Sequence, residues 1–207
     1  MSAASIEEAL ALLDWRRQIA EAYASVRSAA DAQRAWADWH RTRTRLFRAH
    51  GQSPIPATER AAYTGPHLYP YAPQWRVLAD VEPAPVAPLQ LPTSQDEVMT
   101  ARRFARARFE AAGTDLALDL YLLEGYGGGL FLPFADATSG QETYGAGRYL
   151  LDTVKGADLG LQDGRLVLDF NFAYQPSCSY DSRWMCPLAP PANRLPVPVR
   201  AGERLGA

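Results

Sequence analysis

The sequence predicts an α+β fold in which one or two N-terminal helices precede a mainly antiparallel β-sandwich or a partly open β-barrel. Up to about residue 50, apolar residues recur at helical spacing. Beyond residue 114 they alternate with polar residues at a period of two, in short runs separated by glycine turns. We expect the helices to pack against the sheet or to cover one of its edges.

The composition is that of an ordinary globular protein. Of its residues, 47% are hydrophobic and 21% are charged. A chain of 207 residues is long enough to bury a core that needs no disulfide or metal to stabilise it. The formal net charge of -2 argues against nucleic acid as a partner. No basic leader precedes an apolar block, and no apolar run approaches the length of a membrane span. We expect a cytoplasmic protein with no membrane partner and no cofactor, and the sequence does not specify an oligomeric state.

Residues 1–52 form the predicted helical segment. Ser5 and Glu8 have the spacing of a capping box, which places a helix start there. The apolar stripe that follows consists of Ile6, Leu10, Leu13, Tyr23, Val26 and Ala30. A second helix, or a continuation, extends to about His50 with Trp36, Trp39, Leu46 and Phe47 as its stripe. Gly51 can end it, and the prolines at 54 and 56 prevent its return.

A run of arginines lies on the second predicted helix, at Arg41, Arg43, Arg45 and Arg48. A basic helix with tryptophans can bind nucleic acid or a membrane. Because the total charge is close to neutral, we favour the simpler interpretation of a solvated face with acidic partners elsewhere.

Residues 53–113 form a connection rich in proline and aromatic residues. One strand is predicted at 75–81, and the rest reads as extended chain because each proline disfavours helix in the residue before it. The aromatic residues at 63, 69, 71 and 75 indicate that the segment lies on the domain. The stretch 102–112 is compatible with helix or strand, and we favour strand.

Residues 114–207 form the predicted β-rich unit, which we expect to belong to one structural unit with the rest. Leucines at 116, 118, 120 and 122 share one face of a strand. Further strands are predicted at 127–134, 144–151 and 165–174, and Asp163-Gly164 is a turn signal before the last of them.

Polar side chains on the second faces of these strands are the first site candidates. Asp169 and Asn171 share the polar face of the 165–174 strand, about 7 Å apart by strand rise. Tyr144 and Arg148 share a face of the neighbouring strand, and Arg148 could hold a carboxylate or phosphate. It could equally form a structural ion pair with Asp169 or with Glu142, and the polar face could simply be solvated. Gly145 and Gly147 indicate a bulge or a group packed close to the backbone, more often a side chain than a ligand.

The loop from Asn171 to Asn193 is long for a segment without regular structure, and such loops are often functional. It contains the two cysteines of the chain, Cys178 and Cys186, whose spacing does not match zinc or thioredoxin motifs. Since the three histidines lie far off in the sequence, we predict no metal site. Two packed cysteines that fix the loop, able to form a disulfide, are favoured over a thiol nucleophile, which needs a depressed pKa.

Several long motifs resemble one family. GRYL and the pattern N-x-A-Y-x-P-x-C…CP…NRL are the most specific, and LFRAHGQSPIP and YPYAP extend the resemblance over nearly the whole chain. Together they resemble the family called domain of unknown function 1684, in its shorter, actinobacterial-type form. The resemblance implies no established reaction. It marks these signature positions: Gly147, Arg148, Tyr149, Asp169, Asn171, Tyr174, Pro176, Cys178, Cys186, Pro187, Asn193 and Arg194.

The leading functional hypothesis is a small-molecule site, binding or enzymatic, in the β-rich half. Arg148 would anchor an anionic group, Asn171 would orient the ligand, and Asp169 or Glu142 would be the acid–base catalyst. The other expected binding residues are Tyr144, Tyr149, Tyr174, Cys178, Cys186 and Asn193. The competing hypothesis is a non-catalytic interaction module that acts through the helices or an apolar patch. A third is a thiol- or metal-dependent activity of the cysteine pair.

Overall fold

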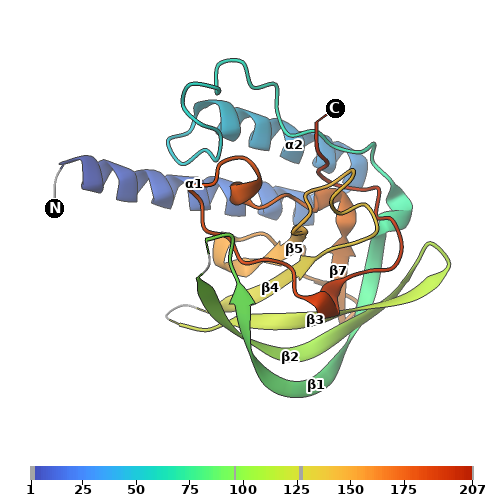
Figure 1. Ribbon diagram of the computed structural model, residues 1–207. Helices are drawn as coiled ribbons and strands as arrows, with labels where there is room; N and C mark the ends of the chain where they lie inside the picture. The colour runs from blue at the N-terminus through green and yellow to red at the C-terminus, as the bar shows by residue number, and fades with distance from the viewer. Residues whose placement is uncertain (1–2, 96, 126–127, 207) are drawn as a thin grey trace.

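A computed structural model describes residues 3–95, 97–125 and 128–206. Two helices, α1 (Ala3–Ser28) and α2 (Ala32–Ala49), lie together on one side of a curved sheet (Figure 1). Within the described residues, neither helix is both long and apolar enough to cross a membrane.

The sheet contains seven strands within these ranges, and its order is β5-β4-β3-β2-β1-β7-β6. Every neighbouring pair is antiparallel, and the sheet does not close, so the predicted α+β fold is confirmed. The strands are β1 (Arg76–Pro92), β2 (Val98–Ala111), β3 (Thr114–Leu123), β4 (Gly129–Phe134), β5 (Arg148–Asp152), β6 (Leu161–Gln162) and β7 (Arg165–Asp169). Short 3-10 helices occur at η1 (Pro73–Trp75), η2 (Thr153–Lys155), η3 (Phe170–Phe172), η4 (Ser177–Ser179) and η5 (Pro191–Asn193).

The helices agree with the sequence except at the start of α1. The Asp31 carboxylate accepts from the amide of Arg34 at 2.9 Å and caps α2, which ends beside Gly51 as predicted. Helix α1 begins at Ala3 rather than at the predicted cap, Ser5. The first three members of its predicted stripe, at 6, 10 and 13, are exposed, whereas Tyr23 is buried.

Strand β1 is longer than predicted, so the expectation of an extended connection after residue 81 is wrong. Its prolines are tolerated because the ladder with β7 spans only Arg76–Ala79 among the described residues. Beyond Ala79 the strand pairs with β2 on one side, and proline is compatible with such an edge. The stretch 102–112, for which we favoured strand, lies in β2 and is confirmed as strand apart from its last residue, Ala112.

Two predicted strands are shorter than expected. β7 ends at Asp169, and residues 170–172 turn into η3, so the predicted alternation through Tyr174 is wrong. β5 begins at Arg148, so Tyr144 precedes the strand. Gly147, at φ 96°, packs against the backbone: a Cβ there would stand 2.5 Å from the carbonyl oxygen of Phe134. Close packing, the favoured explanation for these glycines, therefore holds at Gly147.

Two apolar cores hold the layers together. One gathers around Leu118, Phe134 and Phe170 and includes Leu195 and Val199 of the C-terminal segment. The other lies under the helices, with these buried aromatic residues among its members: Tyr23, Trp39, Phe47, Tyr121, Phe131, Tyr149 and Phe172. The helices therefore cover one region of the sheet, and the C-terminal segment seals another.

Candidate functional site

Arg148 is fully buried at the start of β5, and its hydrogen bonds go to protein groups. Nη2 donates to Asp136 Oδ2 at 2.8 Å and to the Val199 carbonyl at 2.8 Å. Nη1 donates to the carbonyls of Ala201 and Glu203, at 2.5 and 3.0 Å. The ion pair thus forms with Asp136 rather than with Asp169 or Glu142, and it fastens the C-terminal segment to the sheet.

Asp169 and Asn171 meet at the turn where β7 becomes η3. Asn171 Nδ2 donates to Asp169 Oδ1 at 2.8 Å, and the Asn171 amide donates to the same atom at 3.0 Å. The Asn171 side chain also pairs with both backbone groups of Ala72, accepting at 2.8 Å and donating at 2.9 Å. Burial raises the pKa of Asp169 to about 6. The hydrogen bonds from Asn171 and the positive charge of Arg76 oppose this rise. The carboxylate also lines a hollow of about 220 Å³ beside α1.

Glu142 lies at the surface, where its side chain is 38% exposed. Arg200 donates to both of its carboxylate oxygens, the closest contact being 2.7 Å, and Tyr69 donates at 2.9 Å. The Arg200 hydrogen bonds, followed by that from Tyr69, lower the pKa of Glu142 to about 2. The Glu142 carboxylate is therefore ionised at neutral pH, and its oxygens already accept hydrogen bonds from Arg200 and Tyr69.

Three further signature residues make backbone connections. Asn193 is fully buried, and its side chain accepts from the amide of Asp119 at 2.8 Å. It donates to the carbonyls of Asp119 and Pro133, at 2.9 and 2.8 Å, so it ties β3 to β4. Tyr149 and Tyr174 exchange backbone hydrogen bonds of 2.8 and 3.0 Å, and both rings are buried.

A buried ion pair that the sequence did not predict joins α2 to the C-terminal segment. Arg43 donates to Glu203 Oε1 at 2.8 Å through Nε, and its guanidinium lies over the rings of Trp39, Phe47 and Tyr174. The solvated-face interpretation holds for the exposed arginines at 41, 45 and 48 and is wrong for Arg43. The helical spacing of residues 39, 43, 46 and 47 would have placed Arg43 on the apolar stripe.

The two cysteines lie together in the long loop, with free thiols. Cys178 is half-buried, Cys186 is buried, and the Cys178 amide donates to Cys186 Sγ at 3.4 Å. The Tyr144 hydroxyl is 3.8 Å from Cys178 Sγ. Ser94 anchors the loop from the end of β1, because its Oγ accepts from the Cys186 amide at 3.2 Å.

The pKa values of the two thiols are shifted in opposite directions. A hydrogen bond from Cys186, then those from Ser94 and Tyr144, lower the pKa of Cys178 to about 6 in spite of its burial. The same thiol–thiol contact, together with burial, raises the pKa of Cys186. Burial also raises the pKa of Tyr144 to about 12, so the phenol stays protonated at neutral pH. In the described ranges, no group of three or more His, Cys, Asp and Glu side chains is arranged to hold a metal ion.

The predicted site residues therefore belong to several separate groups. Tyr144, Cys178 and Cys186 form one cluster, which we call the thiol cluster. Asp169 and Asn171 form a second group at the η3 turn, and Arg148 and Glu142 each bind a different partner. The sequence signal for the thiol cluster was the placement of both cysteines in one long loop.

Comparisons with known proteins support family membership. The model of the family described as Protein of unknown function (DUF1684) matches residues 61–204. A solution NMR structure of the uncharacterized protein from gene locus rrnAC0354 of Haloarcula marismortui is similar, with 34% sequence identity and a TM-score of 0.59. The similarity covers 82% of this chain and 91% of that one. No curated protein matches the chain. With a family match over most of its length, the chain belongs to the DUF1684 family.

Proposed function

We propose that the thiol cluster is a redox site at which Cys178 reduces a small hydroperoxide and Cys186 completes the reaction as the resolving thiol. The observation that carries this proposal is the 3.4 Å contact of the Cys178 amide with Cys186 Sγ, which places a half-buried and a buried free cysteine side by side. A reactive cysteine needs access to solvent and a stabilised thiolate, and a resolving cysteine must lie next to it.

The different environments of the two sulfurs support different roles. With a pKa of about 6, Cys178 is mostly thiolate at neutral pH, which is the nucleophilic form. The contact with Cys178 and burial raise the pKa of Cys186, so this thiol keeps its proton at neutral pH. The half-buried Cys178 is thus the attacking residue, and the buried Cys186 is the resolving residue.

The proposed chemistry balances with one hydroperoxide for each thiol pair. The Cys178 thiolate attacks one peroxide oxygen, the O–O bond breaks, and the alkoxide leaves with a proton, which forms an alcohol and a sulfenic acid. The Cys186 thiol then attacks that sulfur, the S–O bond breaks, water leaves, and a disulfide forms. The two thiols lose two electrons, which the peroxide gains. A cellular thiol reductant returns the pair to its reduced state.

Tyr144 supplies the proton donor in this scheme. Its hydroxyl lies 3.8 Å from Cys178 Sγ, and its pKa of about 12 keeps the proton available at neutral pH. A donor close to the attacked oxygen stabilises the charge that develops on the leaving group.

This proposal retains a small-molecule site in the β-rich half but moves it away from Arg148, Asp169 and Asn171. Arg148 is enclosed and paired with Asp136, so an anionic ligand would have to displace a buried carboxylate. Because the cycle needs a thiol reductant, the proposal also favours a reducing compartment such as the cytoplasm expected from the sequence.

A peroxide titration of the reduced protein tests the proposal. With one equivalent of hydrogen peroxide, we expect both thiols to disappear and the mass to fall by two hydrogens. In Cys186→Ser, we expect the reaction to stop at a sulfenic acid on Cys178 that dimedone traps. Cys178→Ser is the matched control and should keep an unreacted Cys186. If the wild-type thiols react no faster than free cysteine, or react without forming the internal disulfide, the proposal is wrong.

A further inference from the structure

The hollow of about 220 Å³ that Asp169 lines is separate from the thiol cluster, with which it shares no residue. We call it the Asp169 hollow. Arg27 near the end of α1, Ala32 at the start of α2 and Arg76 of β1 also line it. Apolar side chains complete the lining, among them Val26, Val167 and Phe172. At the ~30 Å³ that a water molecule occupies in the liquid, the hollow has room for about seven waters or for one small organic molecule.

Arg76 and Asp169 occupy directly opposed positions in the antiparallel ladder between β1 and β7. Side chains at such positions share one face of the sheet, with Cβ atoms about 4.5–5.5 Å apart, so an arginine and an aspartate are expected to pair there. Within the described residues no ion pair joins them. Arg76 Nη2 instead donates to Gln162 Oε1 at 3.0 Å, and Asp169 Oδ1 accepts from Asn171. Two opposite charges thus line one hollow without direct contact.

One oxygen of Asp169 is left as a free acceptor. Both hydrogen bonds from Asn171 go to Oδ1, at 2.8 and 3.0 Å, and in the part of the chain that the structure describes no group donates to Oδ2. Asp169 is only 1% exposed, so this oxygen lacks the hydration of a surface carboxylate. The pKa of about 6 still leaves the carboxylate largely ionised at pH 7. A buried, unsatisfied acceptor beside a hollow stabilises a ligand that brings an N–H group to it.

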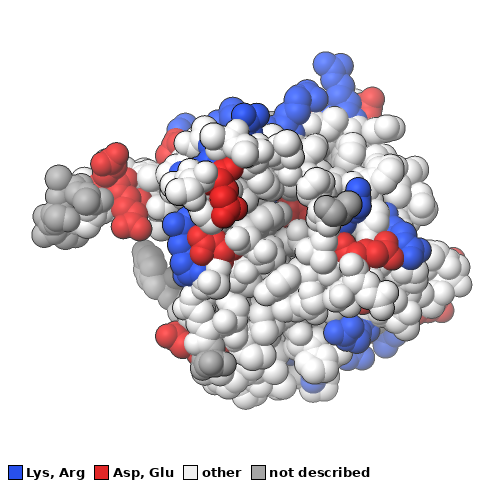
Figure 2. Space-filling model, turned by 45° about the horizontal axis from the view of Figure 1, so that its top comes forward, with Lys and Arg blue, Asp and Glu red and all other residues white. Residues whose placement is uncertain are grey.

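The charge balance around the hollow indicates the class of ligand. Arg27 is already paired, because its Nη1 lies 3.5 Å from Asp158 Oδ2 and donates to the Asp158 carbonyl at 2.8 Å. Arg76 and Asp169 remain as one cation and one anion, so a net anion would be repelled by Asp169 and a net cation by Arg76. Figure 2 shows acidic and basic side chains together on the face that it draws, and long-range attraction there favours neither sign.

We propose that the Asp169 hollow binds a small zwitterionic amino acid, whose ammonium group donates to Asp169 Oδ2 and whose carboxylate accepts from Arg76. The planar guanidinium suits this role because it can hold a carboxylate through two parallel N–H groups. Asn171 is a positioning residue: it holds Asp169 Oδ1 while its own side chain is fixed to both backbone groups of Ala72. The apolar lining leaves space for a short alkyl side chain such as that of alanine.

An NMR titration of the ¹⁵N-labelled full chain at pH 7 with glycine and with L-alanine is the first test. We expect saturable shifts of the Arg76, Asp169 and Asn171 amides, with a dissociation constant of roughly 1 mM, because so small a ligand has few atoms to contribute. Acetate and methylammonium carry one charge each and should bind about tenfold more weakly or less. No saturable shift up to about 10 mM alanine, or acetate binding as tight as that of alanine, overturns the proposal.

Two variants test the two charges separately. Asp169→Asn keeps an oxygen that can accept from Asn171, and Arg76→Gln changes an exposed side chain, so both should fold. Each should weaken alanine binding about tenfold or more. Arg165→Gln is the matched control, because Arg165 is an exposed arginine of the same strand β7 that lines a different hollow.

Thermal unfolding gives a second measurement on the same proteins. Alanine should raise the unfolding temperature of the wild type and of Arg165→Gln, since a ligand that binds only the folded state stabilises it, and should leave that of the other two variants unchanged. If Asp169→Asn and Arg76→Gln bind alanine as tightly as the wild type, the ligand binds elsewhere and the proposal is wrong.

Discussion

Arg148 Nη2 lies 2.8 Å from Asp136 Oδ2, and neither side chain has any exposed surface. Burial lowers the pKa of Arg148, and the ion pair with Asp136 opposes this effect. The guanidinium also holds three backbone carbonyls of the C-terminal segment. The ion pair and these carbonyl contacts offset the cost of burying the charge, and Nε is the guanidinium nitrogen that has no hydrogen-bond partner among the described residues.

Removal of Arg148 should therefore strongly destabilise the fold. Arg148→Met leaves the Asp136 carboxylate buried without its cation, and we expect a loss of about 3–5 kcal/mol in the free energy of unfolding. Urea denaturation measures this loss. Arg200→Gln is the control, because Arg200 pairs with Glu142 at the surface, where solvent screens the pair and its contribution to stability is small. If Arg148→Met does not fold, Asp136→Asn is the milder variant, and similar small losses in Asp136→Asn and Arg200→Gln would contradict the prediction.

The sequence predicted the fold class well because it depends on local periodicity. The leucines of β3 alternate over a whole strand, and the arginine-rich stretch that follows β1 pairs with them as β2. The turn at Asp163-Gly164 joins β6 to β7, with positive φ at both residues, as the sequence indicated. These features need no knowledge of distant contacts.

The site was predicted less well because it depends on where strands end and which distant segments meet. Alternation placed Asp169 and Asn171 on one strand face, but the chain turns at Asp169 because its carboxylate accepts from the amide of Asn171. The partner of Arg148, Asp136, lies in a loop that no periodicity connects to β5. Family resemblance marked Arg148 as a signature position but did not distinguish an anion site from a buried ion pair.

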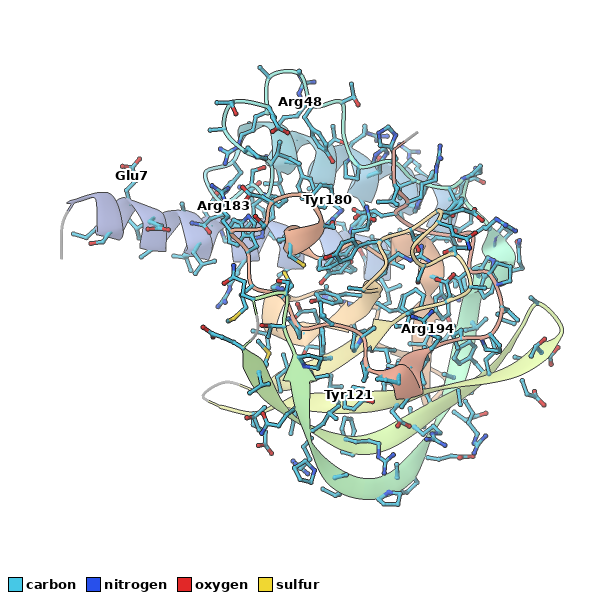
Figure 3. The ribbon with its side chains drawn as sticks, viewed as in Figure 1. Glu7, Arg48, Tyr121, Tyr180, Arg183 and Arg194 are labelled. Atoms are coloured by element: carbon cyan, nitrogen blue, oxygen red, sulfur yellow. The ribbon has the colours of Figure 1, made fainter. Side chains whose placement is uncertain are left out.

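Asn193 should behave as a structural residue. Its side chain satisfies one amide and two carbonyls of the sheet, so Asn193→Ala leaves three buried backbone groups unpaired. We expect a loss of about 1–3 kcal/mol in chemical denaturation. Arg194→Ala, a change at the exposed neighbour labelled in Figure 3, should alter stability by less than about 0.5 kcal/mol. Equal effects at both positions would show that the Asn193 bonds contribute little.

Asp169 should make stability fall as pH rises from about 4 to 6. Its pKa in the folded protein is raised to about 6 from an ordinary 3.8, so the folded state binds the extra proton in this window. The stabilising effect is complete below the unfolded pKa and is lost as pH rises through the folded one. Asp169→Asn keeps an oxygen that can accept from Asn171 and removes the buried charge. We expect it to be more stable than wild type at pH 7 by about 1–3 kcal/mol, from the size of the pKa shift.

Thermal unfolding of both proteins across this pH range measures the difference. The curves should converge below pH 4 and separate above it. Asp115→Asn, a change to an exposed carboxylate on β3, is the control and should follow the wild-type curve. Parallel curves for wild type and Asp169→Asn would contradict the raised pKa. A destabilised Asp169→Asn at pH 7 would mean that the charged hydrogen bonds outweigh the cost of burial.

Cys178 should react as a thiolate below neutral pH. Because the Cys186 hydrogen bond is the largest cause of its lowered pKa, alkylation by iodoacetamide should be half-maximal near pH 6 in the wild type and at clearly higher pH in Cys186→Ala. Tyr144→Phe removes a weaker donor and should shift the midpoint upwards by less. Cys178→Ser identifies the signal by abolishing it. A wild-type midpoint near that of free cysteine, or one unchanged in Cys186→Ala, would show that the two thiols do not share a proton and would leave Cys178 an ordinary surface thiol.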